Sequence, residues 1–122
     1  MNPTPWDFME AKAAAARTSR AQAQAEEDYR EASAAYSIAE RAYRVELAKR
    51  MTELRADGQP ATLIPDLAKG DERIASLKSE RDLSRGLLDA ATHAIWRHNA
   101  DRRDVQRFID WSLQVSTGRA ME

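Results

Sequence analysis

The chain has 122 residues, no cysteine, only four glycines and four prolines, and a formal net charge of −1. The missing cysteines exclude disulfides and thiolate metal sites, and the length allows one domain at most. Abundant Ala, Arg and Glu with 7% aromatic residues favour long helices over a sheet-based core. Because such a chain buries little apolar surface alone, we expect it to pack against copies of itself or a partner.

The sequence also predicts where the protein works. No apolar run approaches the roughly 20 residues of a membrane-spanning helix. Residues 1–6 lack the basic-then-apolar order of a signal peptide. With the missing cysteines, these features favour a cytoplasmic protein that has no membrane partner.

The first predicted helix begins at Thr4-Pro5, where a capping side chain precedes a proline suited to the first helical position. No Pro or Gly then interrupts the chain until Gly58, which fits a left-handed C-terminal cap, and Pro60 blocks continuation. If unbroken through residues 17–28, this helix has about 50 residues and spans roughly 75 Å, which is typical of a coiled coil or an exposed arm.

The apolar pattern divides this helix in two. Residues 1–28 form an Ala-rich arm with high helix propensity and little to bury, and the arm could overhang the rest of the fold. From residue 29 a heptad seam appears, with a one-residue shift after its third tyrosine. Its members are Tyr29, Tyr36, Tyr43, Leu47 and Met51. The tyrosines could form a base-stacking ladder, but such a stripe is more typical of helix packing.

Residues 57–70 form the only substantial break, and we expect them to be the tip loop of a hairpin with room for a short helical turn. Asp71 is expected to cap a second long helix that returns antiparallel to the first. The packing seam of this helix comprises Ile74, Leu77, Leu88, Ile95, Phe108 and Trp111. Leu83 and Leu87 lie on a neighbouring face, which indicates a further packing partner.

The C-terminal part carries weaker signals. Asn99 marks either a kink or the start of a short C-terminal helical extension, and Gly118 is expected to end ordered structure, with residues 118–122 a frayed tail. The predicted fold is therefore all-α: a long, antiparallel, coiled-coil-like hairpin over residues 29–117 that oligomerises. The pattern leaves open whether the helices pair within one subunit or exchange between subunits.

The sequence offers little for catalysis. It has no Gly-rich phosphate loop and no nucleophile elbow. His93 and His98 are five residues apart, which is poor spacing for one helix face, and no acidic residue completes a zinc site with them. The acidic cluster at residues 26–31 lacks the Glu-x-x-His partners of a di-metal site. We expect a protein that is not an enzyme and has no cofactor and no metal.

Basic side chains gather at both ends of the tip loop. A hairpin would bring to one end Lys49, Arg50, Arg55, Lys69 and Arg73. Favourable interaction with the helix dipole at a C-terminus accounts for Arg50 and Arg55 without any ligand. Lys69 and Arg73 flank a helix N-terminus, which disfavours cations but attracts an external anion. The sequence therefore predicts a phosphate-binding tip, which makes these five residues the first candidates for a DNA-binding site.

A secondary basic patch lies in the second helix. It consists of Arg97, Arg102, Arg103 and Arg107, interleaved with aromatic residues. Basic and aromatic side chains together can neutralise and stack on single-stranded nucleic acid. Three aspartates in the same stretch can pair with these arginines at helical spacing. Phe108 and Trp111 favour packing in a core or subunit interface, so the patch ranks below the tip.

The order and spacing of these elements resemble those of the UvsY-type recombination mediators of tailed phages over roughly residues 36–111. The segments that carry the resemblance are Glu46-Leu47-Ala48-Lys49-Arg50-Met51 before Gly58, Leu67-Ala68-Lys69-Gly70-Asp71, the Ile74/Leu77/Leu87/Leu88 rhythm, and Ala94-Ile95-Trp96-Arg97 followed by Arg102, Val105 and Ile109. The Ala-rich arm is not part of the match, and the tip loop differs in length.

The resemblance implies a ring-like homo-oligomer that binds single-stranded DNA through Lys49 and Arg50. It further implies partners, a RecA-like recombinase and single-strand-binding protein, in the cytoplasm of a phage-infected or prophage-bearing bacterial host. Charge reversal at both residues is then expected to abolish DNA binding without loss of helicity or assembly. The alternative is a non-enzymatic protein-interaction module, such as a phage assembly chaperone or scaffold or an inhibitor of a host complex.

Overall fold

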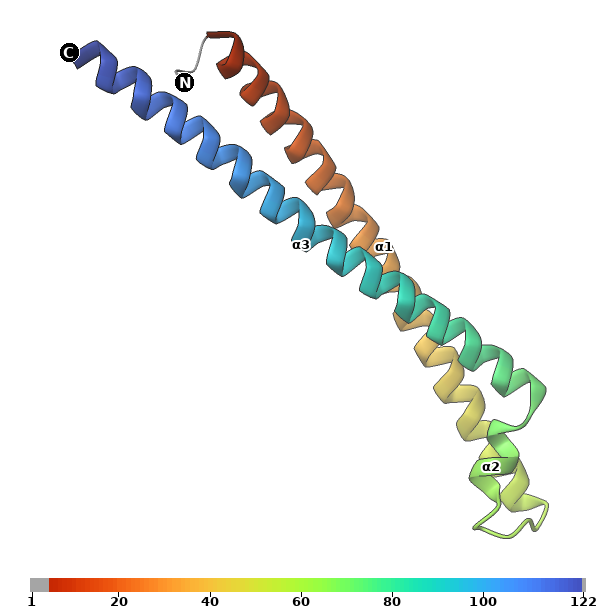
Figure 1. Cartoon of the computed structure of the whole chain (residues 1–122). Helices are drawn as coiled ribbons and strands as arrows, with labels where there is room; N and C mark the ends of the chain where they lie inside the picture. Colours follow the sequence, from red (N-terminus) through yellow and green to blue (C-terminus); the bar gives the residue numbers. More distant parts are fainter. Residues whose placement is uncertain (1–4, 122) are drawn as a thin grey trace. The chain divides into compact units, whose positions relative to one another are not determined.

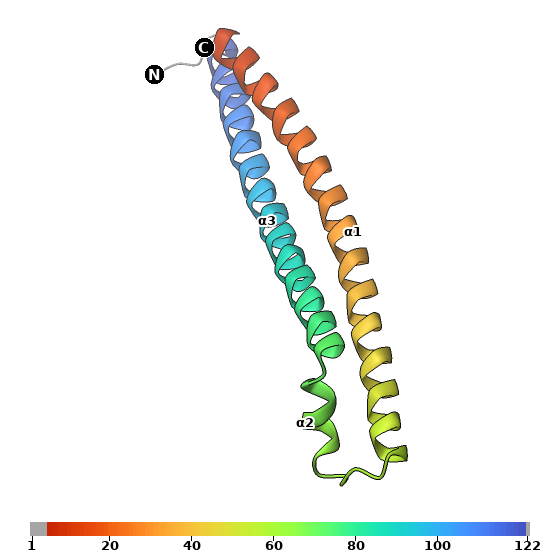
Figure 2. The same ribbon diagram turned by 90° about the vertical axis from the view of Figure 1, so that its right-hand side faces the viewer.

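The computed structural model describes residues 5–121, so the predicted cap at Thr4 lies outside the described residues. Three helices follow in order: α1 (Pro5–Ala56), α2 (Ile64–Lys69) and α3 (Glu72–Met121). Helices α1 and α3 run antiparallel and pack against each other, and no strand occurs among these residues (Figures 1 and 2). The predicted all-α hairpin is confirmed, and α1 is continuous through residues 17–28. None of these helices combines the length and apolar character needed to span a membrane.

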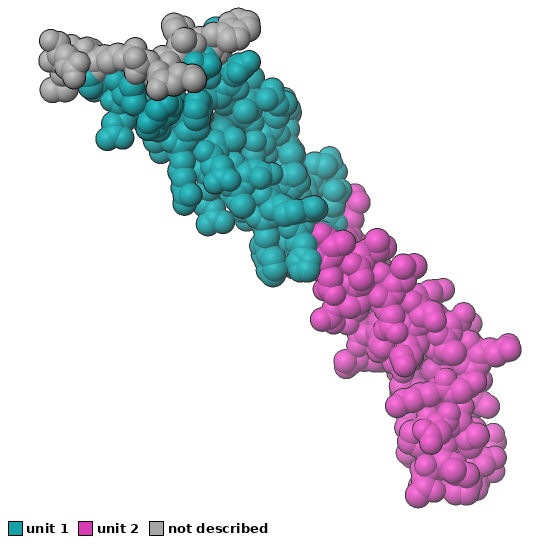
Figure 3. Space-filling view, viewed as in Figure 1, with its two compact units in different colours: residues 1–29, 91–122 teal, residues 30–90 magenta. Residues whose placement is uncertain are grey.

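The chain divides into two compact units (Figure 3). Unit 1 comprises residues 1–29 and 91–122, and unit 2 comprises residues 30–90. Each unit pairs a segment of α1 with a segment of α3, and unit 2 also contains α2. The Ala-rich arm therefore has a partner within the chain, where the sequence allowed a free overhang.

In unit 2, α1 ends in the geometry that its sequence predicts. Gly58 has a φ of 81°, a left-handed conformation that costs glycine little because it has no Cβ. Its N–H donates to the Arg55 carbonyl at 3.1 Å, and the Gln59 N–H donates to the Leu54 carbonyl at 3.1 Å. These two bonds form a Schellman motif, which satisfies carbonyls that the helix end leaves unpaired.

The tip of unit 2 has its own small core. Helix α2 packs Ile64 and Ala68, which are 3% and 0% exposed, against Leu54 of α1, with Leu47 and Met51 around them. In both views α2 lies beside the last turns of α1 (Figures 1 and 2). The expected helical turn in the tip loop thus exists, and burial of its two apolar residues holds it on α1.

Asp71 caps α3 as expected. Its Oδ1 accepts the backbone N–H groups of Arg73 at 3.0 Å and Ile74 at 3.3 Å. These donors belong to the first turn, which has no partners inside the helix. The cap fixes the start of α3 and places Ile74, 2% exposed, in the interior.

The predicted seam lies between the helices of unit 2, although it begins later than expected. Tyr43 is buried and Tyr36 is half-buried, whereas Tyr29 is 39% exposed. On α3, Leu77 and Leu88 are half-buried. Three contacts between the helices define their register: Tyr36 with Arg85, Glu40 with Arg81, and Arg50 with Asp71. Between successive pairs, the residue number rises along α1 by as much as it falls along α3, as expected for antiparallel helices.

Unit 1 has a different interior. Ala11 and Ala25 are buried, and the Gln22 side-chain amide donates to Asn99 Oδ1 at 2.7 Å across the two helices. Small alanines bury little area, so this part of the pair gains less from the hydrophobic effect than a Leu or Ile seam would. The seam residue Ile95 is half-buried.

Phe108 and Trp111 do not pack between the helices of the chain. They are 43% and 44% exposed, because Ile109 and Ser112, one residue further on, occupy the inward positions of the same register. A subunit interface stays their predicted packing site. Two other expectations for α3 differ from the structure. Asn99 does not start a separate helix, since α3 is continuous from Glu72 to Met121. The helix also passes Gly118, where a mid-helix glycine costs about 1 kcal/mol.

Candidate nucleic-acid interface

The hairpin tip brings three of its five predicted basic residues beside carboxylates. Lys49 Nζ lies 3.6 Å from Glu46 Oε1, and Arg73 Nε lies 3.5 Å from Glu46 Oε2. Arg50 contacts Glu53 Oε2 at 3.0 Å through Nη1 and Asp71 Oδ2 at 3.4 Å through Nε. Each cation therefore already has an anionic partner in the folded chain.

These six side chains line one shallow groove of about 180 Å³, together with Ile74. Three cations and three carboxylates line the groove, so their charges cancel. A phosphate entering the groove would meet repulsion from Glu46, Glu53 and Asp71 at close range, which largely offsets its attraction to the cations. The groove can hold the tip together more readily than it can hold an external anion.

The other two tip residues, Arg55 and Lys69, are exposed. Within residues 5–121 neither has a hydrogen bond or ion pair. They remain available to an anion, but they are two isolated charges without an aromatic neighbour at the tip.

The secondary patch in unit 1 has a more distinctive geometry. Trp96, Arg103, Arg107 and Trp111 follow one another at steps of seven, four and four residues, which places them on one face of α3. We call this set the aromatic–arginine stripe. The tryptophans are 61% and 44% exposed, and the Arg107 side chain is 80% exposed. The half-buried residues Val105 and Ile109 and the buried Ser112 lie on other faces, so the stripe is open to solvent.

The arginines of the stripe are less neutralised than those of the tip. Arg107 Nη1 is 4.0 Å from Asp104 Oδ1, at the limit of an ion pair between two highly exposed groups. In the described part of the chain, Arg97, Arg102 and Arg103 have no ion pair or hydrogen bond. Arg102 and Arg103 instead line a groove of about 320 Å³ with Ala15 and Ser19 of α1.

Aromatic rings flank the arginines at both ends of the stripe. Trp96 contacts His93 with ring centroids 5.2 Å apart, and Trp111 contacts Phe108 at 5.7 Å, both tilted. Such pairs limit the rotation of each indole while leaving surface exposed. Exposed, partly fixed aromatic rings beside arginines are the elements that bind unpaired bases and their phosphates.

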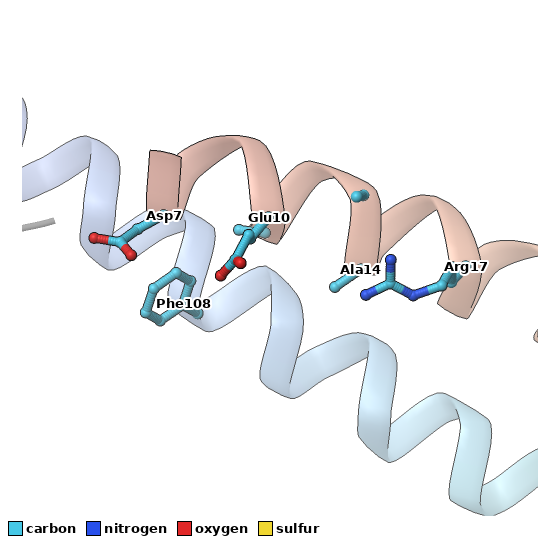
Figure 4. A pocket seen from close by; sticks show the side chains of 7 residues that line it. Asp7, Glu10, Ala14, Arg17 and Phe108 are labelled. Carbon is cyan, nitrogen blue, oxygen red and sulfur yellow. The ribbon is translucent and has the colours of Figure 1, made fainter. Parts of the chain in front are cut away.

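A second hollow in unit 1, of about 560 Å³, lies close to the N-terminal end of α1. It is lined by Phe108 from α3 and by Asp7, Glu10, Ala14 and Arg17 from α1 (Figure 4). The carboxylates of Asp7 and Glu10 share this lining with the ring, and Arg17 lies further along the helix. The acidic lining does not suit a nucleic-acid phosphate.

Unit 2 also holds a polar cluster between its helices. Tyr36 Oη accepts from Arg85 Nη1 and donates to Glu40 Oε2, both at 3.3 Å, and the Arg81 guanidinium lies 4.5 Å from the Tyr43 ring centre. A hydrogen bond from Arg44 is the main cause that lowers the pKa of Glu40. Hydrogen bonds from Arg81 to Asp82 and from Arg85 to Tyr36 raise the pKa of each arginine. The cluster joins the helices and favours the charged forms of Glu40 and both arginines.

The sequence did not indicate this cluster, because Tyr36 and Glu40 meet Arg81 and Arg85 only through the fold. It also missed Ser112, which is 2% exposed and whose Oγ has no hydrogen-bond partner among the described residues. No group of three or more His, Cys, Asp or Glu side chains within residues 5–121 could hold a metal ion.

Comparison with protein-family models, with curated proteins and with solved structures gives no match to this chain.

Proposed function

We propose that the protein is a helical, oligomeric single-stranded-DNA-binding protein that acts as a recombination accessory factor. The observation that carries the proposal is the aromatic–arginine stripe of α3, where two exposed tryptophans bracket two exposed arginines on one helix face. The proposed DNA contact therefore moves from the tip, which the sequence favoured, to the secondary patch.

The stripe supports binding of single strands rather than duplexes. A duplex hides its bases, whereas a single strand can stack a base on an indole and place the adjoining phosphate near a guanidinium. Every base has a face that can stack, so this mode does not depend on sequence. Base–aromatic stacking is worth about 1–3 kcal/mol per base, more than an exposed ion pair contributes.

One stripe alone would bind weakly, because residues 96–111 carry four arginines against three aspartates. Several stripes on one assembly would act together, since the second contact with the same strand is intramolecular. This is how an almost neutral chain can hold a polyanion.

The recombination role rests on the resemblance of residues 36–111 to UvsY-type mediators, which load a RecA-like recombinase onto strands covered by single-strand-binding protein. A binder that contacts single strands weakly at many points can be displaced segment by segment as a recombinase filament grows. That property suits a loading factor better than a tight, sequence-specific grip does.

The test is fluorescence anisotropy of a labelled single-stranded oligonucleotide, titrated with protein at several salt concentrations. Neutralisation of two phosphates per subunit predicts a log–log salt slope of about −1.4 per engaged subunit. The paired variants Arg103→Glu/Arg107→Glu and Trp96→Ala/Trp111→Ala should each weaken binding about tenfold or more. Duplex of the same sequence should compete poorly.

The matched control is Lys49→Glu/Arg50→Glu, which reverses the same number of charges at the tip. We expect this variant to bind within about threefold of the parent, because its cations are already paired. If it alone loses binding while its helicity and assembly persist, the DNA site is at the tip. If the parent protein does not bind at low salt, the DNA proposal fails.

A second candidate, a protein-interaction module, is favoured by one observation. Twelve large apolar side chains of the described residues are exposed, against seven buried apolar residues, of which three are alanines. Exposed apolar residues in such number mark surfaces that bind protein. A chaperone, scaffold or inhibitor of this kind would ignore oligonucleotides and leave a heparin column at low salt.

A further inference from the structure

Helix α1 carries a row of residues on its side facing away from α3 in unit 2. The row is Ala34, Ile38, Arg41 and Val45, spaced four, three and four residues apart. All four are exposed, Ile38 to 71% and Val45 to 41%. We call this set the outer row of α1. It lies roughly half a turn from the seam residues Tyr36 and Tyr43 at 3.6 residues per turn, so α3 of the same chain cannot cover it.

Helix α3 carries a matching row in the same unit. Its members are Ser76, Glu80, Leu83 and Leu87, again spaced four, three and four residues apart. All four are exposed, Leu83 to 67% and Leu87 to 60%. We call this set the outer row of α3. These two leucines form the second apolar face of the helix, for which the sequence predicts a further packing partner.

Each row contains one charged residue, and the two charges are opposite. Within residues 5–121, neither Arg41 nor Glu80 makes an ion pair or hydrogen bond, although Arg44, Arg81 and Asp82 beside them are all paired. In antiparallel alignment Arg41 falls opposite Glu80, Ile38 opposite Leu83, and Ala34 opposite Leu87. In this alignment Ile38 faces a leucine of similar size, and Leu87 faces the small Ala34. The two opposite charges face each other.

From this complementarity we infer that the outer row of α1 in one copy docks antiparallel on the outer row of α3 in a second copy of this chain. The inference rests on the part of the proposed function that makes the protein a homo-oligomer. It names the surface on which the copies meet.

The register of this contact is the same as the register inside the chain. Within unit 2, Tyr36 meets Arg85 and Glu40 meets Arg81, and the inferred pairing of Arg41 with Glu80 continues that numbering. Neighbouring copies of unit 2 therefore lie side by side with no shift along the helix axis. The contact joins two different surfaces, so each copy keeps one free row for the next and the assembly grows beyond a dimer.

The first test is the mass of the assembly, measured by size-exclusion chromatography with light scattering over a range of concentrations. The parent protein should be oligomeric at micromolar concentration. Leu83→Glu/Leu87→Glu and, separately, Ile38→Glu should weaken self-association by roughly tenfold or more, because each buries a charge against an apolar row. These residues are exposed, so helicity and the thermal midpoint of a monomer should persist.

The second test uses the charged pair. Arg41→Glu alone and Glu80→Arg alone should each fail to assemble, because each places like charges opposite each other. An equimolar mixture of the two variants should regain assembly. In that mixture the new glutamate of one variant meets the new arginine of the other, and the remaining contact is the parental pair. Arg55→Glu, an exposed charge reversal on α1 outside the row, is the matched control and should assemble like the parent.

Two outcomes would overturn the inference: variants of both rows that assemble like the parent, or a parent protein that stays monomeric at about 100 µM, a concentration that populates an interface of micromolar Kd. A monomeric parent would leave the rows to a different protein. Failure of the row variants is distinct from failure of the DNA proposal, because stripe variants are scored by oligonucleotide binding and row variants by mass. A monomeric parent would also remove the oligomeric part of the proposed function, whereas oligonucleotide binding would still test the stripe.

Discussion

The two units place different side chains between their helices. In unit 2 the seam contains Tyr43, Leu54 and Ile74, and guanidinium groups of α3 lie against the tyrosine rings of α1. In unit 1 the interior contains small or polar residues, above all alanines, Ser112 and the Gln22–Asn99 hydrogen bond. The fully buried residues between the same two helices are thus mostly large and apolar in one unit and small in the other.

The two units also differ in which basic side chains have carboxylate partners, and this difference bears on both stability and anion binding. In unit 2, Arg50, Arg73 and Arg81 have carboxylate partners and are therefore poor ligands for anything else. Arg41, Arg55 and Lys69 of the same unit have no such partner among the described residues. Unit 1 leaves Arg97, Arg102 and Arg103 without such partners among the described residues. A count of basic residues along the sequence cannot make this distinction, which decides where an anion can bind.

The largest effect on stability is expected from the substitution Leu54→Ala at the tip of unit 2. Leu54 is 6% exposed and contacts Ile64 and Ala68, so the truncation leaves a cavity and should reduce the free energy of unfolding by about 2–4 kcal/mol. Chemical denaturation followed by circular dichroism measures this free energy of unfolding. The matched control is Leu63→Ala, half-exposed in the same loop, which should cost below about 1 kcal/mol. Equal effects from both would show that α2 is not packed on α1.

Much of the fold could be predicted from the sequence because the signals are local. The proline at the start, Gly58 at the end of α1 and Asp71 at the start of α3 each act within one helical turn, and each is found where it was expected. The seam residues from Tyr36 to Met51 on α1 and from Ile74 to Ile95 on α3 are buried or half-buried. Phe108 and Trp111 were assigned to the seam by their apolar character, whereas the continued register places Ile109 and Ser112 on the inward side of α3.

The candidate site was harder to predict because its charges depend on contacts across the hairpin. Neither Asp71 opposite Arg50 nor Glu46 opposite Arg73 can be paired until the register of the two helices is known. A different register would separate Arg50 from Asp71 and Arg73 from Glu46, and only the Glu53 contact of Arg50, which lies within α1, would remain. The aromatic–arginine stripe could be recognised from its spacing, yet its openness to solvent depends on which face of α3 meets α1.

In the polar interior of unit 1, by contrast with Leu54→Ala in unit 2, we expect a truncated side chain to leave the protein as stable as before or more stable. Ser112 is 2% exposed and its hydroxyl has no partner within the described chain, so it loses hydration without regaining a hydrogen bond. Ser112→Ala should leave stability unchanged or raise it by up to about 1 kcal/mol, since the substitution removes the unbonded hydroxyl and leaves a gap of only one oxygen atom. The thermal midpoint and the denaturation curve measure this change, and a loss above about 1 kcal/mol would indicate that the hydroxyl is bonded after all.

The smallest effect concerns the pH dependence of unit 2. Because the hydrogen bond from Arg44 lowers the pKa of Glu40 below its ordinary value of 4.5, the folded chain binds the proton less readily than the unfolded chain. The stabilisation from Glu40 is therefore fully present above pH 4.5 and is lost as the pH falls through the lowered value. The difference in unfolding free energy between the parent and Glu40→Gln should shrink over that acid range.

Arg44→Met removes the main cause of the shift, so in its background Glu40→Gln should change the acid profile much less. A parent–variant difference that stays constant from about pH 7 to about pH 3 would mean that Glu40 gains nothing from its partners, and the polar cluster would then contribute packing but no charge pairing to the stability of unit 2.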